Sequence, residues 1–313
     1  MKIGLIDVDS HGFPNLALMK ISAWHKAHGD QVEWWNGLFK YDRAYQSKVF
    51  DDSYSRDMDF VIQADEVIKG GTGYDLKTVL PDEMEHIYPD YSIYDFLVKD
   101  TAYGYLTRGC PRACPFCIVS EKEGRKSVKV ADINEFYHGQ KNIVLLDPNI
   151  TASKDCESLF DDLIKTKARI EFTQGLNIRL LTDKGADQLN QMKLKVIHFA
   201  WDNYEMQTYQ KLKDMRGKLD FDRRKLMVYV LVNFNTDISQ DLERIYKLKE
   251  LDYEPFVMVY DKPHAPRAIK KLQRWCNNKW VFRKCDFDEY QGGGYGVSDH
   301  VAGNSDSSVE RRE

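Results

Sequence analysis

The cysteines of this chain are concentrated in one short segment. Cys110, Cys114 and Cys117 fall within eight residues at the spacing C-x3-C-x2-C, and they are half of the six cysteines in the sequence. Cysteine thiolates are ligands of zinc and of iron–sulfur clusters. Three thiolates on one loop can hold such a centre and leave one coordination position open, where a small molecule could bind and react. The segment therefore predicts a metal centre with chemistry at an open position.

The choice between zinc and a cluster depends on a fourth ligand. A structural zinc usually takes its other ligands from a second closely spaced Cys or His pair. The sequence has no such pair, because Cys156, Cys276 and Cys285 are scattered and His138 stands alone. Three cysteines on a four-iron cluster leave one iron without a protein ligand. The spacing thus favours a 4Fe-4S cluster over a zinc site.

Composition limits the classes of partner. The 313 residues carry a net charge of −4, which argues against a general nucleic-acid binder and leaves a local basic patch open. No apolar run approaches the roughly 18 residues of a membrane span, so no membrane association is expected. Residues 1–8 resemble a strand rather than a signal peptide, so a cytoplasmic protein is expected. Clustered cysteines in the cytoplasm favour metal binding or catalysis over disulfides.

The second part of the chain alternates strands and helices. Strands are predicted at 103–107, 142–146, 169–173, 195–200, 226–232 and 256–260, with helices near 153–165, 182–192, 237–251 and 266–277. Six such units form a partial (β/α)6 TIM-type barrel. Its reactive face is the ring of loops at the carboxyl ends of the strands, and the cysteine segment follows the first strand. Residues 280–282 are predicted to add a last strand at the rim.

The first part of the chain shows the same alternation on a smaller scale. Strands are predicted at 1–8, 31–35, 44–50 and 66–69, with a helix from residue 16, which indicates a Rossmann-like parallel α/β domain. The predicted organisation is a first domain over residues 1–95, a barrel over 96–290 and a disordered tail over 291–313. The tail is rich in Gly, Ser and charge.

The motif C-x3-C-x2-C after the first strand of a β/α domain resembles the radical S-adenosylmethionine (SAM) superfamily, over about residues 100–290. The resemblance implies a 4Fe-4S cluster on the three cysteines and SAM on the open iron. It further implies that an electron from the cluster cleaves SAM to a 5′-deoxyadenosyl radical, which abstracts hydrogen from a substrate. An electron donor such as flavodoxin or ferredoxin is also implied. The substrate is not indicated.

The resemblance also implies where SAM would be contacted. Phe116 occupies the aromatic position before the third cysteine, which packs near the adenine in the family. Other contacts in the family come from the ends of later strands. The polar residues at those ends are Asp147 and Asn149 for the amino group of SAM, Gln174 and Arg179 for its ribose and carboxylate, and Asp202 and Asn233 after the fourth and fifth strands.

Residues 1–95 resemble cobalamin-binding domains, which carry D-x-H-x-x-G after their first strand. Asp9 and His11 fit this pattern, Pro14 replaces the final glycine, and Ser47 and the pair Gly70-Gly71 follow in the family's order. Two interpretations stay open, a bound cobalamin and a domain of that descent without the cofactor. A cobalamin-dependent radical SAM methyltransferase is therefore one alternative function. A non-catalytic iron–sulfur redox or sensor protein is the other.

Overall fold

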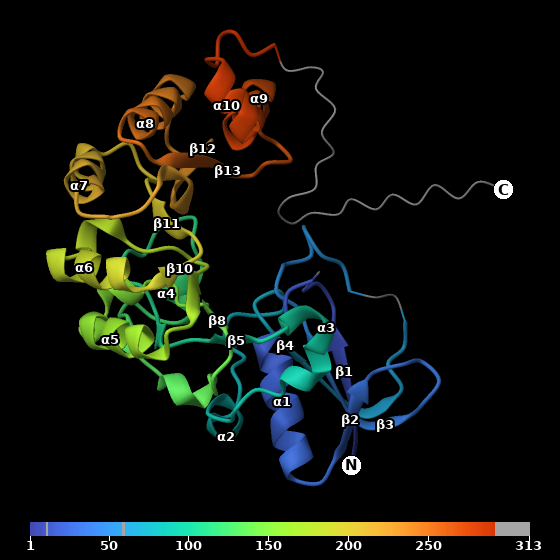
Figure 1. The fold of residues 1–313 in the computed structure, drawn as a ribbon. Coiled ribbons are helices and arrows are strands. Elements are labelled where there is room, and N and C mark those ends of the chain that lie inside the picture. Colours follow the sequence, from blue (N-terminus) through green and yellow to red (C-terminus); the bar gives the residue numbers. More distant parts are fainter. Residues whose placement is uncertain (11, 58–59, 292–313) are drawn as a thin grey trace.

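The structure is a computed structural model that describes residues 1–10, 12–57 and 60–291. Helices alternate with strands, and the larger sheets are parallel throughout. Figure 1 shows β1 to β4 and α1 as one lobe at the lower right, called here the first lobe. The elements from β8 onward lie to its left and above it. The α/β class that the sequence predicts is confirmed.

The first sheet has the strand order β2-β1-β3-β4, with every pair parallel. Its strands are β1 (Lys2–Asp7), β2 (Gln31–Trp34), β3 (Tyr41–Ser47) and β4 (Ala64–Gly70). Helix α1 (Leu16–Ala27) begins at Asn15, whose side chain accepts a hydrogen bond from the Leu18 N–H. Leu18 and Ile21 pack on Ile3 and Leu5 of β1, so the apolar side of α1 covers the sheet.

The second part of the chain supplies two further parallel sheets. One has the order β10-β9-β8-β5 and the other β11-β12-β13. The backbone N–H of Leu176 donates to the carbonyl of His198 in β11, which joins the two sheets beside β9. The strands are β5 (Thr101–Gly104), β8 (Asn142–Leu145), β9 (Arg169–Phe172), β10 (Lys193–Leu194), β11 (Ile197–Ala200), β12 (Leu226–Val232) and β13 (Glu254–Val259).

The four helices predicted in this part are present as α5, α6, α8 and α9, and α7 and α10 were not predicted. Thr182 caps α6 through the Gly185 N–H, and Asp237 caps α8 in a capping box with Gln240. Asp155 precedes α5 without a side-chain capping bond. The helices are α5 (Cys156–Thr166), α6 (Asp183–Gln191), α7 (Met206–Arg216), α8 (Ile238–Glu250), α9 (Arg267–Asn277) and α10 (Lys279–Lys284). Their apolar sides share one core with the strands.

Shorter elements complete the fold. They are the antiparallel pair β6 (Thr107–Arg108) and β7 (Val128–Lys129), the helices α2 (Asp82–Glu85), α3 (Asp95–Val98) and α4 (Val119–Lys122), and 3₁₀ turns at Tyr91–Tyr94, Ile133–Glu135, Ile150–Ala152, Ile178–Leu180 and Arg223–Lys225. In the described ranges no helix combines the length and the apolar character needed to cross a membrane. The tail predicted from residue 291 lies outside the described residues, apart from residue 291 itself.

The strand predicted at 280–282 is wrong, because these residues lie in helix α10. The Asn278 side chain accepts a hydrogen bond from the Val281 N–H, which starts the helix. Phe282 then packs edge-on against Trp275 of α9 and is buried. A short apolar run fits a strand or a helix equally well, and here the capping asparagine before it decides.

A fully buried ion pair joins α8 to the ends of two strands. Arg244 donates to a carboxylate oxygen of Asp241 at 2.6 Å, and both side chains are 0% exposed. The same guanidinium donates to the carbonyls of Trp201, after β11, and Leu231, in β12, at 2.5 and 2.7 Å. The pair therefore fixes the carboxyl ends of β11 and β12 relative to α8.

Replacing Arg244 with Met keeps the length of the side chain but leaves Asp241 as a buried carboxylate without its counter-charge. We expect the free energy of unfolding to fall by about 3–5 kcal/mol. Urea denaturation followed by circular dichroism measures this change. Lys165→Met, in the exposed pair with Asp162, is the control and should keep the wild-type midpoint. A midpoint for Arg244→Met as high as that of the control would contradict the stabilising role of the pair.

Candidate functional site at the cysteine loop

The three clustered cysteines lie in a tight loop, here called the cysteine loop (residues 109–118). Gly109 has a φ of 87°, and a Cβ there would overlap the carbonyl oxygen of Lys126, so only glycine fits. The Cys110 N–H donates to the Gly124 carbonyl, and the Cys117 N–H donates to the Cys114 carbonyl, both at 3.0 Å. Cys110 and Cys114 are half-buried and Cys117 is exposed. The loop is thus ordered by its own backbone, with its thiols at the surface of the fold.

Asn149, after β8, contacts the first cysteine directly. Its side-chain amide donates to Cys110 Sγ at 3.2 Å, and its Oδ1 accepts a hydrogen bond from the Thr151 hydroxyl at 3.0 Å. The hydroxyl donor fixes the orientation of the amide, so that the NH2 group faces the sulfur. Asn149 is 2% exposed. Asn149, which the sequence analysis expected to contact SAM, therefore lies directly against the cysteine loop.

A second contact ties the middle of the loop to the end of β11. Arg112 Nη1 lies 3.1 Å from the Asp202 carboxylate, with both side chains largely buried. Burial raises the pKa of Asp202, and the Arg112 charge opposes that shift. Burial likewise raises the pKa of the Cys114 thiol, again against the Arg112 charge. Sequence reasoning found Asp202 but missed Arg112, although a charged residue inside the cysteine motif was a signal.

A third contact is aromatic and reaches the last two strands. The Phe116 ring lies edge-on to Phe234, after β12, with 5.2 Å between ring centroids. Phe234 in turn lies edge-on to Tyr260, after β13, at 4.9 Å. The cysteine loop therefore contacts the carboxyl ends of β8, β11 and β12, and Phe234 links it to the end of β13. The structure brings Phe116, Asn149 and Asp202 together with the three cysteines.

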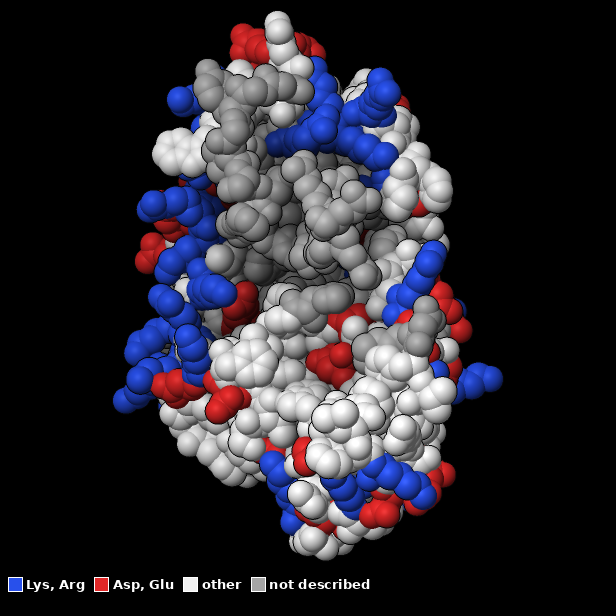
Figure 2. Space-filling view, turned by 90° about the vertical axis from the view of Figure 1, so that its right-hand side faces the viewer, with Lys and Arg blue, Asp and Glu red and all other residues white. Residues whose placement is uncertain are grey.

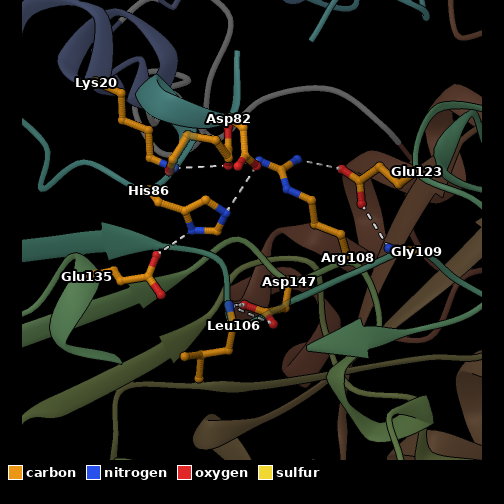
Figure 3. A network of polar contacts seen from close by, with 10 residues as sticks. Lys20, Asp82, His86, Leu106, Arg108, Gly109, Glu123, Glu135 and Asp147 are labelled. Carbon is orange, nitrogen blue, oxygen red and sulfur yellow. Dashed lines mark hydrogen bonds and ion pairs between the residues drawn. The ribbon is translucent and has the colours of Figure 1, made fainter. Parts of the chain in front are cut away.

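Asp147 lies at the end of β8 but faces the backbone that leads into the cysteine loop. Its carboxylate accepts hydrogen bonds from the N–H groups of Leu106 and Thr107 and from the Thr107 hydroxyl. Figure 3 shows its carboxylate beside the backbone nitrogen of Leu106. Asp147 is 4% exposed, and burial raises the pKa of its carboxyl to about 6. Its oxygens are engaged in holding the chain before the loop, away from the residues that contact the cysteines.

The other predicted residues lie at strand ends with different partners. Gln174 is exposed and has no hydrogen bond within the described part of the chain. Arg179 pairs with Glu205 at 2.9 Å. The Asn233 side chain donates to the carbonyl of Tyr260 at 2.8 Å and so links the ends of β12 and β13. The structure does not bring these three residues onto the cysteine loop.

Arg108 holds the start of the loop from the other side (Figure 3). Its Nη1 lies 3.2 Å from the Glu123 carboxylate, and that carboxylate also accepts the Gly109 N–H at 3.1 Å. The guanidinium covers the ring of Tyr105, 3.9 Å from the centroid. Arg108 and Glu123 thus close the loop at its base.

The ion pairs continue from Arg108 into the first lobe (Figure 3). Arg108 Nη2 lies 3.1 Å from Glu85 of α2, and the same carboxylate oxygen lies 2.9 Å from Lys20 of α1. Burial would raise the pKa of Glu85, but the charges of Lys20 and Arg108 lower it below its ordinary value. His86 beside it pairs with Glu135 at 2.8 Å. The first lobe therefore supports the cysteine loop directly, which no sequence pattern indicated.

The motif that resembles cobalamin-binding domains is filled by the chain itself. Both oxygens of Asp9, which is 1% exposed, accept backbone N–H groups, from Val49 and Phe50, at 2.8 Å. A Cβ on Gly71 would overlap the carbonyl of Lys48, so this glycine serves a close approach between two segments of the protein. His11 lies outside the described residues.

Two other observations bear on binding sites. Within the described ranges, no group of three His, Cys, Asp or Glu side chains is arranged to hold a single metal ion. A four-iron cluster requires no such convergence, because each thiolate binds a different iron. A cavity of about 510 Å³ lies between α1 and the start of β5, at the amino end of that strand and so away from the carboxyl ends that the cysteine loop contacts. None of the predicted site residues lines it.

The chain matches no family model and no curated protein. The geometry of the site is therefore the basis for its interpretation. Asn149, Asp202 and Phe234 contact the cysteine loop itself. Arg108, through Glu123, and Asp147 hold the chain at the start of the loop.

The raised pKa of Asp147 predicts a pH dependence of stability. Between its unfolded pKa near 4 and its folded pKa of about 6, the folded chain binds more protons than the unfolded chain. The free energy of unfolding should therefore fall as pH rises through this window, by about 3 kcal/mol in total. Asp147→Asn lacks this titration. Urea denaturation from pH 4 to 7 should show the wild type losing stability relative to the variant, and parallel pH profiles would contradict the assignment.

Proposed function

We propose that this chain is a radical SAM enzyme whose cluster is held by Cys110, Cys114 and Cys117. The observation that carries the proposal is the position of the cysteine loop, which contacts residues at the carboxyl ends of three parallel strands, β8, β11 and β12. Ligands of parallel α/β folds bind at this edge. The parallel strands β5, β8, β9, β11, β12 and β13, with the short β10 paired to β9, support a partial (β/α)6 barrel, with a Rossmann-like domain before it.

The residues of the loop suit an iron–sulfur cluster. The three thiols are the ligand type that such clusters require. Asn149 offers an amide N–H to Cys110 Sγ, and hydrogen bonds to ligand sulfurs stabilise their negative charge. Burial raises the pKa of the Cys114 thiol, and the positive charge of Arg112, two residues before it, opposes that shift. The donor set and its surroundings thus fit the group.

The cluster and SAM, when bound, supply the electron transfer and the carbon radical that removes a hydrogen atom from a substrate. The residues of the chain position and shield these groups. Phe116 and Phe234 form an apolar wall beside the loop, suited to contact with an adenine ring. Gln174 is exposed at the end of β9 and available to a ribose. Arg179 would contact a carboxylate by exchanging its pair with Glu205.

Cobalamin is not part of the proposal. The carboxylate of Asp9 is occupied by two backbone N–H groups, and the glycine pair packs against the chain. The proposed role of the first lobe is to support the cysteine loop, because Glu85, paired with Lys20, contacts Arg108 before the loop.

Replacing Cys114 with Ala removes one of the three cluster ligands. We expect anaerobically reconstituted wild type to be brown, to contain a four-iron cluster, and to form 5′-deoxyadenosine from SAM under reduction. Cys114→Ala should lose both the cluster and this product. Cys156→Ala, outside the loop, is the matched control and should keep both. A wild type that binds zinc would contradict the proposal, and one that holds a cluster without cleaving SAM would support the non-catalytic alternative.

The amide of Asn149 predicts an electrochemical effect. Its N–H stabilises negative charge on Cys110 Sγ, and reduction increases that charge. Asn149→Ala should therefore shift the reduction potential of the reconstituted cluster to a more negative value. A redox titration followed by electron paramagnetic resonance measures the shift. Asn142→Ala, at the other end of β8, is the control, and an equal potential in Asn149→Ala and this control would remove Asn149 from the cluster environment.

A further inference from the structure

The last two helices carry a concentration of positive charge that the net charge conceals. Residues 262–284 contain no Asp or Glu, although the whole chain has a net charge of −4. This basic segment contains eight Lys and Arg residues, namely Lys262, Arg267, Lys270, Lys271, Arg274, Lys279, Arg283 and Lys284. The expectation that the chain avoids nucleic acid rested on the average charge, which does not describe this surface.

Helix α9 separates its apolar and basic residues. Its buried residues are Ile269, Leu272, Trp275 and Cys276, and its basic residues are Arg267, Lys270, Lys271 and Arg274. The four cations stand three, four and seven positions from the first, so they lie along one side of the helix. Like charges at this spacing destabilise a helix. The apolar side anchors α9 in the fold. Among the cations, Lys270 donates to the carbonyl of Pro263 and Lys271 lies over the rings of Phe287 and Tyr290, whereas Arg267 and Arg274 are exposed.

Most cations of α5, α6 and α8 have a carboxylate partner, whereas most of those in the basic segment do not. Lys247 of α8 pairs with Glu243, and Lys165 of α5 pairs with Asp162. Within residues 1–10, 12–57 and 60–291, Lys279 and Arg283 are the basic-segment residues with a carboxylate partner, and they share Glu254. The segment is left with a large excess of positive charge.

An exposed tryptophan stands among these charges. Trp280 of α10 is 78% exposed, and Arg283 and Lys284 follow it by three and four positions, on the same side of the helix. Its neighbour Phe282 is buried against Trp275, so the fold uses one aromatic of α10 and leaves the other in solvent. An exposed aromatic ring beside cations is the combination that binds unpaired bases and phosphates.

The basic segment begins beside the candidate site. Tyr260, after β13, contacts Phe234, which contacts Phe116 of the cysteine loop. The connection from Tyr260 leads into α9, whose 11 residues extend about 16 Å from that point. Figure 2 shows Lys and Arg side chains gathered at the top of the face, the level at which Figure 1 places α9 and α10. The charged surface thus runs outward from the candidate site.

We propose that the basic segment binds single-stranded or looped nucleic acid, with phosphates on the cations of α9 and an unpaired base on Trp280. Arginine binds phosphate with two parallel hydrogen bonds, and base stacking on an aromatic ring tolerates any sequence. An anionic membrane is the less suitable partner, because an interfacial helix inserts an apolar side and that of α9 is buried in the core. Binding of nucleic acid to the basic segment does not depend on the radical SAM chemistry proposed above. A role of the bound nucleic acid as the substrate of that chemistry would rest on the proposed function.

The test measures binding of a fluorescein-labelled oligouridine of about 20 nucleotides to the full chain by fluorescence anisotropy, at several salt concentrations. The wild type should bind, and its affinity should fall with salt. The triple variant Arg267→Gln, Lys270→Gln, Arg274→Gln should bind more weakly, with a salt slope reduced by about 2. Trp280→Ala should weaken binding about tenfold at an unchanged slope. Circular dichroism confirms that each variant is folded.

Controls separate this surface from charge in general and from the cluster chemistry. The triple variant Lys165→Gln, Lys184→Gln, Lys218→Gln removes the same charge from exposed lysines outside the basic segment and should bind as the wild type does. Cys114→Ala should also bind normally, so failure of the proposed function would leave this result intact. The proposal is overturned if the wild type does not bind, if the control triple variant loses as much affinity, or if phosphatidylglycerol vesicles displace the oligonucleotide at equal charge concentration.

Discussion

The site depends on the parallel direction of the strands. Because every pair from β5 to β13 within the two sheets is parallel, the carboxyl ends of these strands lie along one edge. The residue after each strand therefore faces the same region, although these residues are up to about a hundred positions apart in sequence. This edge supports the cysteine loop through an amide after β8, a carboxylate after β11 and an aromatic ring after β12. A loop held at three strand ends presents its thiols in a fixed arrangement.

Much of this arrangement could be predicted from the sequence, because its signals are local. The spacing of the cysteines, the alternation of strands and helices and the capping residues Thr182 and Asp237 each depend on a few neighbouring residues. The ends of strands follow from the same patterns, and the family resemblance directed attention to Asn149 and Asp202 at those ends, which contact the cysteine loop in the structure. The position of α10 was missed because three apolar residues in a row do not distinguish helix from strand.

Contacts between distant segments were beyond the sequence. Asp147 and Asn149 both follow β8, and only the path of the backbone determines that one supports the chain before the loop and the other contacts Cys110. The pairing of Arg112 with Asp202 joins residues 90 positions apart. The chain has more than 40 residues of each charge, so composition alone cannot indicate which of them meet. Burial and packing make that selection.

The pairing of Glu85 with both Lys20 and Arg108 has a consequence for the modular character of the protein. The sequence suggests two domains joined near residue 95, which evolution could have combined as separate parts. The carboxylate of Glu85 nevertheless belongs to the first part and holds a residue two positions before the first cysteine. A fragment that begins after residue 95 would retain every cysteine and still lack one anchor of their loop. The boundary that the sequence suggests between two domains therefore does not bound the structure that supports the cysteine loop. Only a segment that contains both parts would carry the complete support of this loop into another protein.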